Sequence, residues 1–303
     1  MAAEKPFRIV QVSDSHLSGR AAWFLDNWDV FVNEMRAAPP DLIVWSGDVS
    51  LSGADGEADL DFARHEMRRL PCRTLVIPGN HDIGEPAGSG NGEFPNPKRE
   101  RPITDHRRRR WRKYFGSEWW SENLGSWSLY GLNAQLFGSC LKAESQQLDF
   151  FTKALKTAGG RPGLLFLHKP LFYSDPAEHK HQLYCVLPEG RQRILQLARD
   201  FNIKVIGSGH LHCYRSIRHQ KIRIIWAPAT AFINTLKKKN RPPIRVIRRV
   251  GYVEYHIRGP YLTSHLIEPD LFVSHDIRNW SKAHGTTVNL PLRPHVRLGQ
   301  DIR

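Results

Sequence analysis

The chain of 303 residues is long enough for one large catalytic domain, or for such a domain with a small appendage. Its composition is 40% hydrophobic and 10% aromatic, which excludes a disordered chain and allows a large buried core. Lysine and arginine number 44 against 30 acidic residues, and this formal charge of +14 attracts phosphate-bearing partners without deciding the fold.

Short apolar runs alternate with helical periodicity along the first third of the chain. Strands are expected at residues 7–12, 41–46 and 73–77, and helices at residues 23–37 and 57–70, where prolines follow the helices. Strand–helix alternation of this kind predicts an α/β architecture in which crossover helices connect the paired strands of a sheet.

The second part of the chain opens with residues 84–102, which are rich in glycine, proline, asparagine and charge and are expected to form a long loop. Beyond this loop we expect helices at 104–115, 146–155 and 192–200, and strands at 127–137, 163–167, 204–206, 222–226 and 251–257. We assign residues 1–270 to a catalytic domain and residues 271–303 to a C-terminal extension or tail.

Five polar blocks recur at one kind of position, the loop directly after a short apolar strand. They are Asp14-Ser15-His16, Gly47-Asp48, Gly79-Asn80-His81-Asp82, His168 and Gly209-His210-Leu211-His212. Ligands of open α/β sheets bind outside the carboxyl ends of the strands, so these five loops are expected to meet at one site. Each block alone is more often structural than functional, but five in the same position argue for a common site.

The blocks supply carboxylates, imidazoles and one amide, which suit divalent ions such as Mn, Fe or Zn. They offer more ligands than one tetrahedral zinc needs, and enough for two ions. Asp48 is the expected bridge because a carboxylate has two oxygens, and a bridged pair of metals roughly 3.5–4 Å apart can clamp the attacking and leaving oxygens of a phosphoryl displacement. The glycines before Asp48, Asn80 and His210 are expected to allow tight backbone turns beside the metals.

Together the blocks resemble those of the calcineurin-like metallophosphoesterase superfamily over residues 14–212. The resemblance implies an α/β (α+β) fold, a two-layered β-sandwich flanked by helices, with the metals at the loop ends. It implies a first metal held by Asp14, His16, Asp48 and His212, and a second metal held by Asp48, Asn80, His168 and His210. A hydroxide bridging the two metals would be the nucleophile.

The same resemblance gives His81 two catalytic roles, contact with the substrate phosphate and protonation of the leaving group, with Asp82 orienting it. Physical chemistry agrees, because two cations neutralise a phosphodiester and an imidazole can donate a proton near neutral pH. Asn80, His81 and Lys169 form the expected substrate-binding set.

Sequence details narrow the branch of the superfamily. Phosphoprotein phosphatases carry Gly-Asp-x-Val-Asp-Arg-Gly, whereas residues 47–53 contain no arginine, and the lipid A pathway hydrolases have arginine where His81 stands. The compact motif form, with Ala227-Pro228-Ala229-Thr230, is similar to that of the bacterial class III cyclic nucleotide phosphodiesterases. That branch has His-His-Pro-Pro where this chain has His168-Lys169-Pro170-Leu171, so Lys169 is either a phosphate ligand or a solvated surface lysine.

We therefore expect a phosphodiesterase for cyclic nucleotides or related small phosphodiesters. A nuclease for single-stranded nucleic acid and a broad phosphomonoesterase are the alternatives. The nuclease alternative rests on two basic segments, residues 98–113 with nine Lys or Arg and residues 237–249 with seven, of which the first is expected near the mouth of the site. A metal-bearing binding protein without turnover would lack a ligand or the general acid, and neither is missing.

The cysteines and the apolar runs indicate the cellular compartment of the protein. The four cysteines form no CxxC pair and no spacing typical of a disulfide framework. The N-terminus has no apolar segment of a secretory signal, and no run approaches the roughly 18 apolar residues of a membrane span. These features predict a cytoplasmic protein with reduced thiols and no membrane span.

Overall fold

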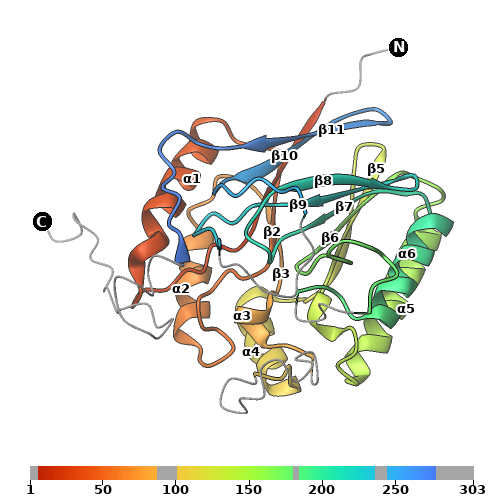
Figure 1. Cartoon of the computed structure of the whole chain (residues 1–303), viewed down its shortest axis with the longest axis horizontal. Helices are drawn as coiled ribbons and strands as arrows, with labels where there is room; N and C mark the ends of the chain where they lie inside the picture. The colour runs from red at the N-terminus through yellow and green to blue at the C-terminus, as the bar shows by residue number, and fades with distance from the viewer. Residues whose placement is uncertain (1–5, 87–100, 180–183, 236–243, 278–303) are drawn as a thin grey trace, which may run out of the picture.

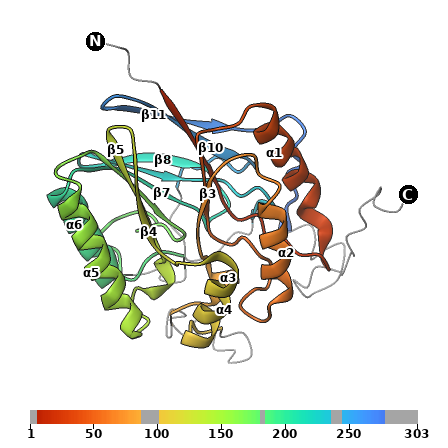
Figure 2. The same ribbon diagram turned by 180° about the vertical axis from the view of Figure 1, so that it is seen from behind.

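The computed structural model describes residues 6–86, 101–179, 184–235 and 244–277. Within these ranges two β-sheets face each other, and helices flank them on both outer sides (Figures 1 and 2). No helix of the described ranges is long and apolar enough to cross a membrane.

The first sheet has five strands in the order β11-β10-β1-β2-β3. Its strands are β1 (Phe7–Val12), β2 (Leu42–Ser46), β3 (Thr74–Ile77), β10 (Tyr252–Arg258) and β11 (Tyr261–Ile267). The first three strands run parallel, because α1 (Leu25–Ala37) and α2 (Ala58–Met67) cross over between them, whereas β10 and β11 are antiparallel additions at the β1 edge.

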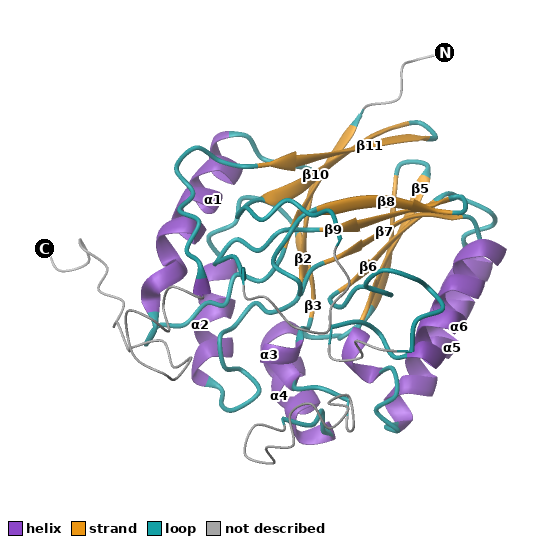
Figure 3. Ribbon diagram, in the orientation of Figure 1, coloured by secondary structure: helices purple, strands orange, loops and turns teal. Residues whose placement is uncertain are grey.

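The second sheet has six strands in the order β4-β5-β6-β7-β9-β8. They are β4 (Trp120–Leu124), β5 (Trp127–Leu132), β6 (Gly163–Leu167), β7 (Ile203–Ser208), β8 (Arg215–His219) and β9 (Ile222–Trp226). The central four run parallel, and α5 (Lys142–Thr157) and α6 (Pro188–Asp200) flank the outer face. The short α3 (Asn80–Ile83) and α4 (Asp105–Phe115) lie at one end of the sandwich (Figure 3).

Three apolar clusters account for these layers. One fills the space between the sheets and includes Val44 of the first sheet and Phe166 of the second. Another joins the first sheet to α1 and α2, where the Trp45 ring stacks on Trp28 with centroids 4.6 Å apart. The third joins the second sheet to α5 and α6. Because both faces of the central strands are covered, these strands are mostly apolar. The predicted sandwich flanked by helices is confirmed.

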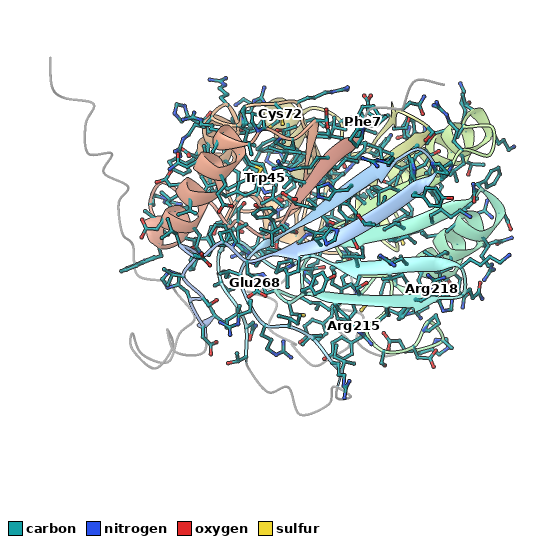
Figure 4. All side chains as sticks on the ribbon, turned by 90° about the horizontal axis from the view of Figure 1, so that it is seen from above. Phe7, Trp45, Cys72, Arg215, Arg218 and Glu268 are labelled. Atoms are coloured by element: carbon teal, nitrogen blue, oxygen red, sulfur yellow. The ribbon has the colours of Figure 1, made fainter. Side chains whose placement is uncertain are left out.

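Four elements differ from the sequence analysis, which indicates neither α3 nor the strands β4, β8 and β11. The last three are edge strands in which exposed polar residues alternate with partly buried ones, as with Arg218 of β8 (Figure 4). The strand expected at 127–137 ends at Leu132, because the Asn133 side chain accepts a hydrogen bond from the amide of Gln135 and starts a 3₁₀ turn.

The expected loop at 84–102 and the expected tail at 271–303 lie mostly outside the described residues. At the base of the loop, Glu85 and Pro102 form an isolated parallel bridge. Residues 271–277 pack against the sandwich, where Phe272 contacts the cluster under α1 and Ile277 is buried. The division of the chain at residue 270 stays a prediction.

Candidate metal centre

The five polar blocks come together at the carboxyl ends of β1, β2, β3, β6 and β7. His16 Nε2 lies 3.2 Å from His212 Nε2, although 196 positions separate the two residues. Asp48 Oδ2 lies 3.8 Å from His16 Nε2 and 3.3 Å from His168 Nε2. Asp48 is therefore placed between the histidines that were assigned to different metals.

The His and Asp side chains of the blocks form three groups that could each hold a metal ion, and one group includes His81. Within each group, the potential ligand atoms all lie within 4.8 Å of one another. The groups are Asp14, His16 and His212; His16, Asp48 and His81; and Asp48, His168 and His210. The remaining predicted ligand, Asn80, places Oδ1 at 3.2 Å from His168 Nε2. All seven predicted ligands therefore meet in one place, and Asp48 belongs to two of the groups.

Five of these ligands have a backbone conformation that L-residues rarely adopt. Their φ angles are 52° at Asp14, 44° at His16, 48° at Asp48, 69° at His210 and 51° at His212. Among the other described non-glycine residues, only Cys140, Asn202 and Gln220 have positive φ. Such residues cost about 1–3 kcal/mol each and cluster at functional sites, where the surrounding structure holds them.

The glycines of the blocks serve two different purposes. Gly47 has a φ of 94°, so the predicted need for a special turn is confirmed there. Gly79 has an ordinary φ of −106°, but a Cβ at this position would lie 2.2 Å from Asp48 Oδ1. At Gly79 the turn explanation is therefore wrong, and close approach of the backbone to the bridging carboxylate is the reason for glycine.

Gly79→Ala is expected to displace Asp48 and to lower both metal content and activity. The thermal stability of the fold should fall only slightly. Gly56→Ala is the matched control, because a Cβ there meets nothing within 4 Å. Metal analysis and thermal unfolding of the two variants provide the comparison. Wild-type metal content in Gly79→Ala would contradict the packing argument.

The two buried carboxylates are held in their charged form by neighbouring histidines. Burial would raise the pKa of Asp48, but His168 and His81 outweigh it and hold that pKa well below the usual range. In the same way His212 keeps the pKa of Asp14 low despite its burial. Conversely, burial would lower the pKa of His168, but Asp48 raises it to about 9. The carboxylates and imidazoles of the centre therefore stabilise one another's charged forms.

Backbone carbonyls set the orientation of two of the rings. His168 Nδ1 lies 2.9 Å from the Ser46 carbonyl, and His212 Nδ1 lies 2.8 Å from the Phe232 carbonyl. Since a carbonyl only accepts, each Nδ1 donates and each Nε2 is left for a metal. His16 Nδ1 has no hydrogen-bond partner among the described residues, so a neutral His16 can carry its proton on Nε2 and donate it to His212 Nε2. A metal ion bound there would instead take both Nε2 atoms as ligands.

A model of the calcineurin-like phosphoesterase family matches residues 7–214, which is more than half of the chain and includes all seven predicted ligands. The chain is a calcineurin-like phosphoesterase. As a member of this family it hydrolyses phosphoric esters, and the predicted enzyme class is confirmed.

The relatives of this phosphoesterase are distant. It is 24% identical over 241 residues to the probable glycerophosphodiester phosphodiesterase GpdQ of Arcobacter nitrofigilis, a match that covers 72% of this chain and 77% of that protein. It is 22% identical over 270 residues to the probable cyclic nucleotide phosphodiesterase CBUA0032 of Coxiella burnetii, covering 86% and 96%. Its fold is similar to that of the purple acid phosphatase PPD1 of yellow lupin, with a TM-score of 0.63, 14% identity and coverage of 90% of this chain and 53% of that protein.

In this phosphoesterase the carboxylate of Asp82 holds the loop after Asp48. It is fully buried and accepts hydrogen bonds from the amides of Gly79 (2.8 Å), Ser50 (2.9 Å) and Val49 (3.2 Å) and from the Ser50 hydroxyl (2.6 Å). The His81 ring is oriented by another group, the Leu51 carbonyl, 2.8 Å from its Nδ1. The expectation that Asp82 orients the His81 ring is therefore wrong, because the contacts described for its carboxylate do not include that ring.

Lys169 of the phosphoesterase lies inside the protein. Its side chain is 2% exposed, and its ammonium pairs with the carboxylate of Glu85. The solvated-surface alternative is therefore wrong. The ion pair connects the loop that carries His168 to Glu85, which follows α3. Since Asn80 is the first residue of α3, the pair supports two ligands of the second predicted metal.

The first basic segment contributes to the loop behind His81. Arg107 Nε donates to the Ala54 carbonyl at 2.7 Å, and the Ala54 amide donates to the His81 carbonyl at 2.8 Å. Arg108 is buried and its Nε lies 2.9 Å from Glu118 Oε2. Much of this segment is therefore structural, and its residues 98–100 lie outside the described ranges.

Reversing the charge of Arg108 and of its exposed neighbour Arg109 is expected to have different effects. Arg108→Glu leaves two carboxylates together at Glu118 and should destabilise the fold by about 3–5 kcal/mol. Arg109→Glu should change stability by less than about 0.5 kcal/mol and should raise KM for anionic substrates. Denaturant unfolding and KM at two salt concentrations test the pair, and equal losses of stability would contradict the assignment.

Sequence analysis missed two residues that contact the centre, Phe232 and Glu85. Phe232 follows closely after Ala227-Pro228-Ala229-Thr230, and that similarity was the one signal in the sequence that pointed to this region. Glu85 follows the Asn80–Asp82 block, but no residue spacing links it to Lys169. Both act through contacts between segments that are far apart in the chain.

Proposed function

We propose that this phosphoesterase is a phosphodiesterase with two divalent metals, Mn, Fe or Zn, and that its substrates are cyclic nucleotides or related small phosphodiesters. The position of Asp48 carries the proposal, since one of its oxygens lies within 4 Å of the Nε2 atoms of both His16 and His168. The first metal would be held by Asp14, His16, Asp48 and His212, and the second by Asp48, Asn80, His168 and His210.

The protein's own residues define what each part of the centre does. When bound, the metal pair neutralises charge on the phosphoryl group and lowers the pKa of an attacking water. His81 holds its Nδ1 on the Leu51 carbonyl, so its Nε2 is the atom that would contact the phosphate and deliver a proton to the leaving oxygen. Asn80 and Lys169 complete the proposed substrate contacts, and for Lys169 this requires release from Glu85.

The preference for diesters is supported by the motif form and by the relatives. Both curated relatives carry the name of a phosphodiesterase, one for glycerophosphodiesters and one for cyclic nucleotides, and the chain spans 77% and 96% of their lengths. We also propose a cytoplasmic location, because the four cysteines form no CxxC pair and have no spacing typical of a disulfide framework.

One observation favours single-stranded nucleic acid as a second candidate substrate. Tyr214, two residues after His212, exchanges backbone hydrogen bonds of 2.8 and 2.9 Å with Ile247. This pairing holds the described part of the second basic segment, with its exposed Arg245 and Arg248, next to the loop of the first metal. Phosphate backbones bind such arginines.

Substrate preference tests the proposal directly. Protein loaded with Mn²⁺ should have a higher kcat/KM for cyclic nucleotides and bis(p-nitrophenyl) phosphate than for p-nitrophenyl phosphate or single-stranded DNA. Protein treated with a chelator is the control, and its activity should return with added metal. A preference for the monoester or for DNA would replace the diester assignment with the corresponding alternative.

A further inference from the structure

The aromatic ring of Phe232 lies against both histidines proposed for the first metal. Its centroid is 5.0 Å from that of His16, with the rings inclined by 30°, and 4.3 Å from that of His212. Its carbonyl also accepts the hydrogen bond from His212 Nδ1 at 2.8 Å. One residue therefore supports the faces of two ligand rings and fixes the tautomer of one of them.

Phe232 is held by a segment from the end of the described chain, residues 272–277, which we call the C-terminal strap. The residue after Phe232, Ile233, donates its amide to the His275 carbonyl at 2.8 Å and accepts from the Ile277 amide at 3.1 Å. The Phe232 ring also contacts Phe24, with centroids 4.9 Å apart. The strap thus pairs with the Phe232 segment as a short strand would.

A buried amide of α1 ties the same two segments together. Asn27, 1% exposed, donates from Nδ2 to the carbonyls of Thr230 (2.7 Å) and Val273 (3.0 Å), and its Oδ1 accepts from the Val273 amide at 2.8 Å. Both donors of the amide and its oxygen are therefore used. A buried side chain with this hydrogen-bonding pattern fixes the distance between the strap and the Phe232 segment.

The segment before Phe232 reaches the remaining ligand of the first metal. The Thr230 amide donates to the Ser13 carbonyl at 3.1 Å, and the Ala231 amide donates to the Asp14 carbonyl at 3.3 Å. Within the described residues, the contacts of Phe232 and the strap thus reach Asp14, His16 and His212. They include none of the ligands proposed for the second metal alone.

We infer that Phe232 is a positioning residue for the first metal, and that the C-terminal strap and Asn27 hold it in place. The inference rests on the proposed two-metal function. It also gives the region expected to be a tail a role in metal binding.

Metal titration tests the inference in the metal-free full-length protein. Zn²⁺ competing with a chromophoric chelator should report two equivalents for the wild type. In Phe232→Ala and Asn27→Ala one equivalent should bind about 10–100-fold more weakly, as is typical when residues that orient ligands are lost, while the other equivalent is unchanged. Leu271→Ala, next to the strap and with 75% of its side chain exposed, is the control and should keep both affinities.

Electron paramagnetic resonance with Mn²⁺ supplies a readout independent of activity. The wild type should give the spectrum of an exchange-coupled pair, and the two variants that of isolated ions at the same metal concentration. Phe232→Leu, which keeps most of the apolar volume, should show the same change to a smaller degree and serves where Phe232→Ala does not fold.

The outcomes separate this inference from the function on which it rests. A wild type that binds fewer than two metals would refute the two-metal function itself. A wild-type pair with unchanged affinities in both variants, or with equal weakening of both sites, would refute only the role of Phe232 and the strap.

Discussion

Asp48→Asn is expected to nearly abolish turnover. The change removes the negative charge of the carboxylate whose Oδ2 lies within 4 Å of the Nε2 atoms of both His16 and His168. Residues that merely orient ligands cost about 10–100-fold in affinity or activity when they are replaced, and loss of the bridging ligand should exceed that range. The measurement is kcat/KM at saturating Mn²⁺, together with metal content.

Asp149→Asn is the matched control for this change, because it removes the same charge from an exposed position on α5. It should leave activity and metal content unchanged. The prediction assumes that activity requires metals. Full activity of the wild-type protein after exhaustive chelation would contradict that assumption.

His81→Ala is expected to slow substrates according to their leaving groups. A leaving alkoxide needs a proton in the transition state, because its conjugate acid has a pKa far above neutral, whereas a nitrophenolate leaves readily without one. Cyclic nucleotides and alkyl diesters should therefore lose more rate than p-nitrophenyl esters, by up to the roughly 10²–10⁴-fold contribution of general acid catalysis.

Two conditions make the His81 comparison decisive. Chemistry must limit the rate for both substrates, since slow product release hides the difference. Metal content must equal that of the wild type, because the adjacent Asn80 is a proposed ligand. Equal losses on both substrate types under these conditions would mean that His81 stabilises charge on the phosphate and that another group donates the proton.

The meeting of the five polar blocks could be predicted from the sequence because each block follows a short, mostly apolar strand. Parallel strands end at the same edge of a sheet, so Asp14, Asp48 and His168 had to approach one another once the sandwich formed. This reasoning needs only local patterns and the topology. The same patterns failed for β8 and β11, because pairing with β9 and β10 determines their conformation.

Roles that depend on contacts between distant segments could not be predicted. Asp82 belongs to a recognisable block, but its bonds to the amides of Val49 and Ser50 exist only after two loops meet. Asn27 lies on a helix face whose apolar pattern gives no sign of the backbone that it will contact. The role of Arg108 could not be predicted either, since composition does not distinguish an exposed arginine from one that is paired with a carboxylate inside the fold.

The left-handed backbone at five ligands has a consequence for how this protein changes under selection. The positive φ angle of each such residue costs conformational free energy, and glycine or asparagine at the same position would lower that cost. Proteins generally hold stability only just above the level that function requires, and strained active sites give up part of it. A lineage released from the need to hydrolyse esters would therefore be expected to lose its ligands first, and to become a more stable protein as it does so.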